Sequence, residues 1–115
     1  LVSAIKTQAE KLGVEIIDYQ SNVEGEIVNK IYELSDAGVE LGIINPGAFT
    51  HTSIALRDCI AGASIKFVEV HISNISEREA FRQISYVREY AFKTIMGHGT
   101  DGYLEAIDAL LGELR

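Results

Sequence analysis

The chain has 115 residues, enough for one domain with a single packed core. Its net charge of −7, from 17 acidic and 10 basic residues, is the wrong sign for a nucleic-acid-binding protein. The single cysteine, Cys59, excludes an internal disulfide and a cysteine-based zinc site. No apolar stretch approaches the roughly 20 residues of a membrane span, and no signal peptide opens the chain. We therefore expect a cytoplasmic protein that binds neither nucleic acid nor membrane.

The first predicted element is a helix at the start of the chain. Leu1, Ile5, Ala9 and Leu12 recur at helical spacing, and Gly13 stands where such a helix would end. In a βαβ fold, an amphipathic helix normally crosses over from a preceding strand. We therefore expect that a strand and its following loop are missing ahead of this helix. The alternative is a complete four-stranded protein that begins with a helix.

Four apolar, β-favouring segments predict buried parallel strands: "VEIIDY" (14–19), "LGIINP" (41–46), "IKFVEV" (65–70) and "AFKTIM" (91–96). Their first residues are 27, 24 and 26 positions apart, which is the length of a βα unit with short loops.

Apolar residues at helical spacing predict further helices: Ile27, Ile31 and Leu34 in one, and Leu104, Ile107, Leu110 and Leu111 in the last. Ser21 and Glu24 match a capping box at the start of the second helix. The alternation of helices and strands predicts an α/β fold over residues 1–115, a doubly wound parallel sheet with helices on both faces.

In such sheets, ligands bind outside the carboxyl ends of the strands, which here read "QSN" (20–22), "NPGAFTHTS" (45–53), "HISN" (71–74) and "GHGTDG" (97–102). The last segment matches the G-x-G-x-x-G dinucleotide motif at Gly97, Gly99 and Gly102. That motif requires a following strand with an acidic residue about 20 positions on, whereas here the sequence ends after one helix. We therefore interpret these glycines as a tight turn with close helix packing, and His98 as a loop residue.

The segment "NPGAFTHTS" ends a strand at Asn45 and leads into a helix that Thr50 or Thr52 could cap. The amino terminus of that helix suits an anion or a polar ligand. His51 lies there, either as a ligand-binding residue or as an ordinary loop histidine. Arg57, further along, and its neighbour Asp58 have the pattern of a solvated helix face.

The segment "FVEVHISNISEREAFR" (67–82) carries the strongest chemical signal. Glu69 and His71 are two apart on an extended strand, so both side chains point the same way. A carboxylate beside an imidazole orients the ring, which makes His71 a candidate proton donor. Ser73 and Asn74 follow at a turn, where hydroxyl and backbone N–H groups can hold a carboxylate.

Arg78 and Arg82 are i and i+4, so on a helix both could face the same pocket. Alternatively, these arginines pair with Glu77 and Glu79 on the surface. Because polar groups from three strand ends converge on one edge of the sheet, we favour a binding site. A candidate acid, oxyanion donors and no covalent nucleophile suit proton transfer on a small polyhydroxylated or carboxylated compound.

Two long segments, "INPGAFTHTSIALRD" (44–58) and "EVHISNISEREAFR" (69–82), closely resemble type II 3-dehydroquinate dehydratase, a lyase of the shikimate pathway. "YQSNVEGEIV" (19–28) and "GHGTDGYLEAI" (97–107) are also similar to that family, so the resemblance covers nearly the whole chain. It implies a flavodoxin-like three-layer α/β/α sandwich, no cofactor or metal, and anti elimination of water from 3-dehydroquinate through an enolate, in the route to chorismate and aromatic amino acids. It also implies trimers assembled into a homododecamer.

By motif match, the resemblance makes His71 the general acid, with Glu69 supporting it. Ile72 and Ser73 would hold the substrate carboxylate through backbone N–H groups and the Ser73 hydroxyl. Three residues would bind the ring hydroxyls and the carboxylate side of the substrate: Asn45, His51 and Arg82. Asp58 would reach across a subunit contact toward a neighbouring site.

The family's first strand, with a G-P-N-L-N-type motif, has no counterpart in this sequence, nor does the mobile loop that carries the basic tyrosine and its arginine partner. None of the five tyrosines matches that position: Tyr19, Tyr32, Tyr86, Tyr90 and Tyr103. The sequence therefore predicts the binding half of the site and the acid. Two alternatives remain open: a non-catalytic flavodoxin-like anion-binding module or truncated paralogue, and a nucleotide-binding domain that uses Gly97–Gly102.

Overall fold

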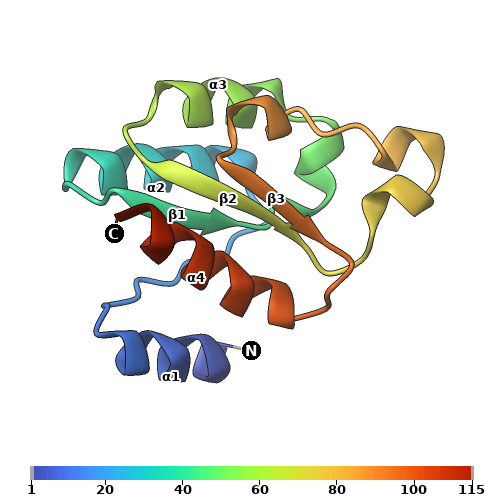
Figure 1. Cartoon of the computed structure of the whole chain (residues 1–115). Helices are drawn as coiled ribbons and strands as arrows, with labels where there is room; N and C mark the ends of the chain where they lie inside the picture. The colour runs from blue at the N-terminus through green and yellow to red at the C-terminus, as the bar shows by residue number, and fades with distance from the viewer. Residues whose placement is uncertain (1, 115) are drawn as a thin grey trace.

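The protein folds around a three-stranded parallel sheet with helices on both faces (Figure 1). The computed structural model describes residues 2–114, with side chains described for 2–112. The helices are α1 (Val2–Leu12), α2 (Glu24–Asp36), α3 (Ile54–Gly62) and α4 (Asp101–Leu114). The strands are β1 (Leu41–Ile44), β2 (Lys66–His71) and β3 (Lys93–Met96). Four short 3₁₀ turns lie between them: η1 (Gly47–His51), η2 (Ile75–Glu77), η3 (Ala80–Arg82) and η4 (Arg88–Tyr90).

The central strand β2 pairs with β1 on one side and β3 on the other, so the sheet order is β1-β2-β3. Ile44 lies opposite Glu69 in β2, and His71 lies opposite Met96 in β3. The parallel register brings the carboxyl ends of all three strands to one edge of the sheet. The predicted α/β fold with a parallel sheet is therefore confirmed.

Alternation along β2 divides the core into two halves. Phe67 packs with buried residues of α2 and α3, such as Ile31 and Leu56. Val68 and Val70 point to the other face and pack under α4. Figure 1 shows the same layers, with α2 and α3 on one side, α4 on the other, and α1 outside α4. Because side chains alternate along a strand, Glu69 and His71 lie on the same face as Phe67.

The predicted strand at 14–19 is wrong. Residues 14–20 have no regular structure, and the large side chains of Ile17 and Tyr19 are exposed. A strand exists only when a neighbouring strand accepts its backbone hydrogen bonds, and within residues 2–114 this segment pairs with neither β1 nor any other strand. Of the four parallel strands predicted from the sequence, the described residues therefore form three.

Two predicted helix caps are also wrong. Ser21 donates to Glu26 and accepts the Val23 N–H at 3.0 Å, so it forms no capping box with Glu24. At α3 the cap is Ser53, whose hydroxyl accepts the Leu56 N–H at 2.9 Å. Neither Thr50 nor Thr52 caps this helix, because the 3₁₀ turn η1 delays its start to residue 54.

The segment 75–90 holds three 3₁₀ turns and no α-helix, so Arg78 and Arg82 do not lie on one helical turn. Arg78 is extended, with φ −91° and ψ −173°, between η2 and η3. Its carbonyl accepts the Gln83 side-chain amide at 2.8 Å, whereas the N–H of Arg82 donates to Glu79. A side-chain bond thus replaces the i→i+4 backbone bond that an α-helix would need.

A close backbone approach within the sheet gives a test of this packing. A Cβ on Gly42 in β1 would lie 2.5 Å from Cε1 of the buried Phe67 ring. We expect Gly42→Ala to lower the free energy of unfolding by about 1–3 kcal/mol, as overpacking does, measured by urea denaturation. The control is Gly25→Ala in α2, where a Cβ meets nothing within 4 Å and helix propensity favours alanine. Wild-type stability of Gly42→Ala would contradict this packing.

Candidate active site

A cleft of about 250 Å³ opens at the carboxyl ends of β1 and β2. Its walls come from the ends of these strands and from the 3₁₀ turns that follow them. The lining residues are Asn45, Gly47, Ala48, His51, His71, Ile72, Ser73, Ile75, Arg78 and Arg82. This set contains both histidines and both arginines that the sequence predicts for the site. The sequence predicts that polar groups from three strand ends converge, whereas the cleft brings together only two of them, those of β1 and β2.

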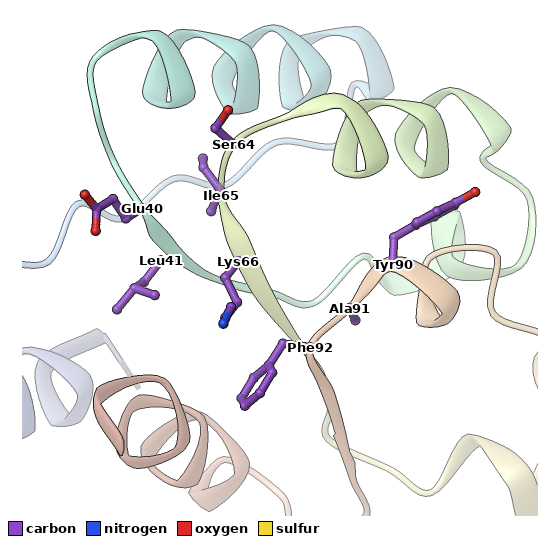
Figure 2. Close-up of a pocket in the computed structure, with 8 residues that line it drawn as sticks. All are labelled: Glu40, Leu41, Ser64, Ile65, Lys66, Tyr90, Ala91 and Phe92. Carbon is purple, nitrogen blue, oxygen red and sulfur yellow. The ribbon is translucent and has the colours of Figure 1, made fainter. Parts of the chain in front are cut away.

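A larger hollow of about 660 Å³ lies at the opposite, amino-terminal edge of the sheet (Figure 2). It is lined by Glu40, Leu41, Ser64, Ile65, Lys66, Tyr90, Ala91 and Phe92. The Lys66 ammonium lies 5.0 Å from the centre of the Phe92 ring there. None of the residues that the sequence predicts for the site lines this hollow. Polar groups converge at the smaller cleft, which is therefore the candidate active site.

His71, which lines the cleft, forms a buried carboxylate–imidazole pair with Glu69, which lies behind it on β2. His71 Nε2 lies 2.5 Å from Glu69 Oε2, and both side chains are almost completely buried. The contact follows from the strand's alternation, because residues two apart point to the same face. The expectation that Glu69 and His71 lie side by side is therefore confirmed.

Glu69 is held by two further donors. The Ser85 hydroxyl donates to Oε2 at 2.7 Å, and the Thr94 hydroxyl donates to Oε1 at 3.2 Å. Burial by itself raises the pKa of the Glu69 carboxyl, but the hydrogen bonds from His71 and Ser85 and the charges of His71 and Arg88 outweigh it, and the net pKa is lowered. Glu69 is therefore ionised near neutral pH despite its burial.

The ionised carboxylate determines how His71 carries its proton. A carboxylate is only an acceptor, so His71 Nε2 must be the donor in this contact. Nδ1 is then the ring nitrogen left for proton exchange with a ligand. In its doubly protonated form, His71 can release a proton from Nδ1 while Glu69 continues to hold Nε2–H.

His51 is fixed in the complementary way. Its Nδ1 donates to the Ile84 carbonyl oxygen at 2.7 Å, because a carbonyl can only accept. Its Nε2 is then available to contact a ligand in the cleft. His51 thus lines the cleft in a defined orientation.

Asn45 is oriented by two contacts within the chain. Its side-chain oxygen accepts the Gly47 N–H at 3.1 Å, which identifies the oxygen end of the amide. Its Nδ2 then donates to the Tyr103 hydroxyl at 2.9 Å. One N–H of the amide remains for a ligand.

The two arginines line the cleft and also pair with Glu79. Arg82 Nε donates to Glu79 at 2.6 Å, and Arg78 Nε lies 3.9 Å from the same carboxylate. Arg78 also donates to the Ser73 hydroxyl at 3.2 Å. The sequence offers surface pairing and a place in the cleft as alternatives, and both are true of Arg78 and Arg82.

The other two segments predicted as strand ends, 20–22 and 97–102, contribute no residue to the cleft. Gly97 and Gly99 have positive φ values of 80° and 59°, and a Cβ on Gly102 would lie 3.2 Å from Val70. The interpretation of these glycines as a tight turn with close helix packing is confirmed. His98 is an exposed loop residue whose Nδ1 lies 2.6 Å from Glu105.

Comparison with known proteins identifies the family. The family model described as "Dehydroquinase class II" matches residues 1–111 of this chain. The chain belongs to the class II dehydroquinase family.

Individual relatives support the same assignment. The chain is 48% identical over 115 residues to a 3-dehydroquinate dehydratase from Aliivibrio fischeri, covering all of this chain and 76% of the relative. It is 46% identical over 108 residues to "Catabolic 3-dehydroquinase 1" from Fusarium vanettenii, covering 94% and 74%. The crystal structure of a type II dehydroquinase from Butyrivibrio crossotus superposes with a TM-score of 0.93 at 46% identity, covering 96% of this chain and 77% of that one. The fold is therefore flavodoxin-like.

Sequence reasoning about this dehydroquinase missed four residues that support the site: Ile84, Ser85, Thr94 and Tyr103. The strand register pairs Thr94 with Glu69, so an alignment of the predicted strands could have found it. Ser85 is 16 residues from Glu69 in a segment without regular structure, and no local pattern points to it. Tyr103 lies in the first turn of α4, a position that its apolar helix pattern does not distinguish.

Asp58, predicted to serve a neighbouring subunit, is exposed on α3 and is not among the residues that line this chain's cleft. The sequence predicts that Arg57 lies on a solvated helix face, but its guanidinium donates to the Tyr86 carbonyl at 2.9 Å and to Glu89 at 2.7 Å.

Within residues 2–114 the dehydroquinase chain has no helix long and apolar enough to cross a membrane. In the same part of the chain, no three His, Cys, Asp or Glu residues cluster as metal ligands.

The lowered pKa of Glu69 makes stability depend on pH. Its ionised form stabilises the fold at pH values above its unfolded pKa, and this stabilisation is lost as the pH falls through the lowered folded pKa. We expect Glu69→Gln to cost about 1–3 kcal/mol at pH 7. The difference from wild type should narrow below pH about 4.3, the ordinary glutamate value.

Urea unfolding of both proteins from pH 7 to acid would measure this, with the exposed Glu105→Gln as the matched control. A difference that stays constant across that range would contradict the assigned ionisation of Glu69.

Proposed function

We propose that this dehydroquinase is a hydro-lyase that eliminates water from 3-dehydroquinate to give 3-dehydroshikimate, by anti elimination through an enolate. The observation that carries the proposal is that His71, which lines the cleft at the carboxyl edge of the sheet, is held by the buried carboxylate of Glu69. Family membership and the names of the relatives support the same substrate.

His71 is the proposed general acid. As the enolate collapses, the bond from the ring carbon to the leaving hydroxyl breaks, and a proton from His71 Nδ1 completes a water molecule. Glu69 is held ionised by its donors, so it stabilises the positive charge on the His71 imidazole before that imidazole gives up its proton. The contact between Glu69 and Nε2 also keeps the imidazole of His71 in one orientation.

The substrate is held by the remaining walls of the cleft. Backbone N–H groups at Ile72 and Ser73, with the Ser73 hydroxyl, are proposed to bind its carboxylate. Asn45 and His51 offer an amide N–H and an imidazole Nε2 to the ring hydroxyls, and Arg82 lies on the carboxylate side. Neutral and cationic donors of this kind suit an anionic polyol in a protein of net charge −7.

The base of the reaction is not assigned among the described residues. None of the cleft-lining residues is a tyrosine, and Tyr103 is engaged in holding Asn45. In an anti elimination, acid and base act from opposite faces of the substrate ring. A base is therefore required on the side of the bound ring away from His71.

The shikimate pathway is the proposed setting, because it contains this dehydration. A relative named as catabolic is about as similar to this chain as the relative named simply as a dehydratase. The competing function is a non-catalytic anion-binding module, which would bind 3-dehydroquinate without releasing product.

The acid is tested by His71→Ala in the full-length protein. We expect kcat for 3-dehydroquinate, followed by the ultraviolet absorbance of the conjugated product, to fall at least about a hundredfold, the usual contribution of a positioned acid. The matched control is His98→Ala, an exposed histidine outside the cleft, which should retain wild-type turnover. Undiminished turnover by His71→Ala would remove this residue from the mechanism. Binding without turnover by the wild type would favour the binding module.

We also propose that the protein is cytoplasmic and assembles as trimers within a homododecamer, with Asp58 serving a neighbouring active site. The exposed position of Asp58 on α3, outside its own chain's cleft, supports a role toward another copy. A heterologous contact closes into a ring when the rotation between neighbouring copies is a whole fraction of a turn, and the proposed trimer is such a ring.

Mixing two defective variants tests the shared site. Asp58→Asn and His71→Ala should each be nearly inactive, but subunits refolded together from an equal mixture should regain activity. About a quarter of the sites would then combine an intact His71 with an intact Asp58 from the neighbour, if subunits assort at random in a closed ring. Activity equal to the mean of the two separate variants would place Asp58 in its own chain's site, and light scattering would give the assembly mass.

A further inference from the structure

Two adjacent residues in the segment between η3 and η4 help to orient both cleft histidines, one directly and one through Glu69. The Ile84 carbonyl accepts Nδ1–H of His51 at 2.7 Å. The Ser85 hydroxyl donates to Glu69 Oε2 at 2.7 Å, the same oxygen that His71 contacts. Neither Ile84 nor Ser85 lines the cleft. They therefore act on the site only through other side chains.

The Ser85 hydroxyl is itself oriented. The backbone N–H of Arg88 donates to it at 3.2 Å, so one lone pair of Ser85 Oγ is occupied. A hydroxyl has a single proton, and this one is directed at Glu69. The Ser85 hydroxyl thus links the backbone of Arg88, at the start of η4, to the Glu69 carboxylate.

The segment that carries Ser85 is fastened to α3 and η1. The Tyr86 N–H donates to the Thr50 carbonyl at 3.0 Å, and the Tyr86 carbonyl accepts from Arg57 at 2.9 Å. Arg57 also binds Glu89 at 2.7 Å, and Val87 is fully buried in the core with α2 and α3. These contacts hold Ser85 at a fixed distance from β2.

We propose that Ser85 is a positioning residue of the dehydration, because its hydroxyl holds the Glu69 carboxylate in the orientation that directs His71 Nδ1 to the substrate. The inference rests on the function proposed above. The two carboxylate oxygens are not equivalent: Oε2 takes the 2.5 Å and 2.7 Å contacts, whereas Oε1 takes only the 3.2 Å contact from Thr94. Without Ser85, the carboxylate loses the contact that distinguishes its oxygens.

The charged and titratable groups that face Glu69 determine its response to pH. His71 faces it from β2 and Arg88 acts on it from η4, whereas β3 contributes only the uncharged Thr94. Each donor stabilises the ionised carboxylate, so removal of one raises the pKa of Glu69. The acid-side loss of activity would then begin at a higher pH.

The test is Ser85→Ala in the full-length protein. We expect kcat to fall roughly 10- to 100-fold, which corresponds to the loss of a hydrogen bond to a charged group, while KM stays nearly unchanged because Ser85 does not line the cleft. The acid limb of the pH profile of kcat should move to higher pH. Ser85→Thr keeps the hydroxyl and should restore both values.

Thr94→Val is the matched comparison, because it removes a hydroxyl donor from Oε1, the oxygen that His71 does not contact. Its effect on kcat should be smaller than that of Ser85→Ala. Wild-type kcat and an unmoved acid limb in Ser85→Ala would overturn the proposal, as would an equal loss in Ser85→Thr.

Histidine ring ¹⁵N resonances give a readout that does not depend on turnover. In Ser85→Ala the His71 signals should shift, whereas His51, bound to the Ile84 carbonyl, should keep its Nδ1–H signature. Equal shifts at both histidines would indicate displacement of the whole segment and overturn a specific role for the hydroxyl. An inactive wild type with the expected His71 shift would refute the proposed function alone.

Discussion

The interaction on which the site depends is the buried negative charge of Glu69. A carboxylate in the central strand of a sheet, without solvent contact, is stable only where donors replace the water it has lost. The donors come from its own strand, from β3 and from the segment before η4. Strand pairing, docking of that segment and orientation of His71 are therefore satisfied together, and none of the three can shift alone.

The same alternation that builds the core also selects the site. Val68 and Val70 fill the face under α4, while Phe67 fills the opposite face. Glu69 and His71 continue that opposite face toward the carboxyl edge, where helix cover ends and the cleft begins. A shift of one residue in the register of β2 would exchange the faces and place the carboxylate in the apolar layer beneath α4. The apolar pattern thus constrains the catalytic geometry.

Local patterns predicted what local physics determines. The parallel sheet, the Glu69–His71 contact and the convergence of Asn45 and His51 follow from strand alternation and from the common edge of parallel strands. The segment 14–19 has the composition of a strand but no hydrogen-bonded neighbour among the described residues, and composition cannot supply one. Ser85 reaches Glu69 through the docking of an irregular segment, which has no periodic signal in the sequence. The resemblance to the family is carried by motifs that are much longer than these patterns of a few residues.

Glu79 orients Arg82, one of the cationic side chains that line the cleft of this acidic protein. Its hydrogen bond from Arg82, with the charges of Arg82 and Arg78, lowers the pKa of Glu79, so the carboxylate is ionised and paired. The pair does not consume Arg82, because Glu79 occupies Nε and a guanidinium has four further N–H donors on its terminal nitrogens. Glu79 instead fixes the plane of the guanidinium before a substrate arrives. A carboxylate that enters the cleft then meets an oriented fork of donors, and the conformational cost of ordering Arg82 falls on the fold rather than on binding.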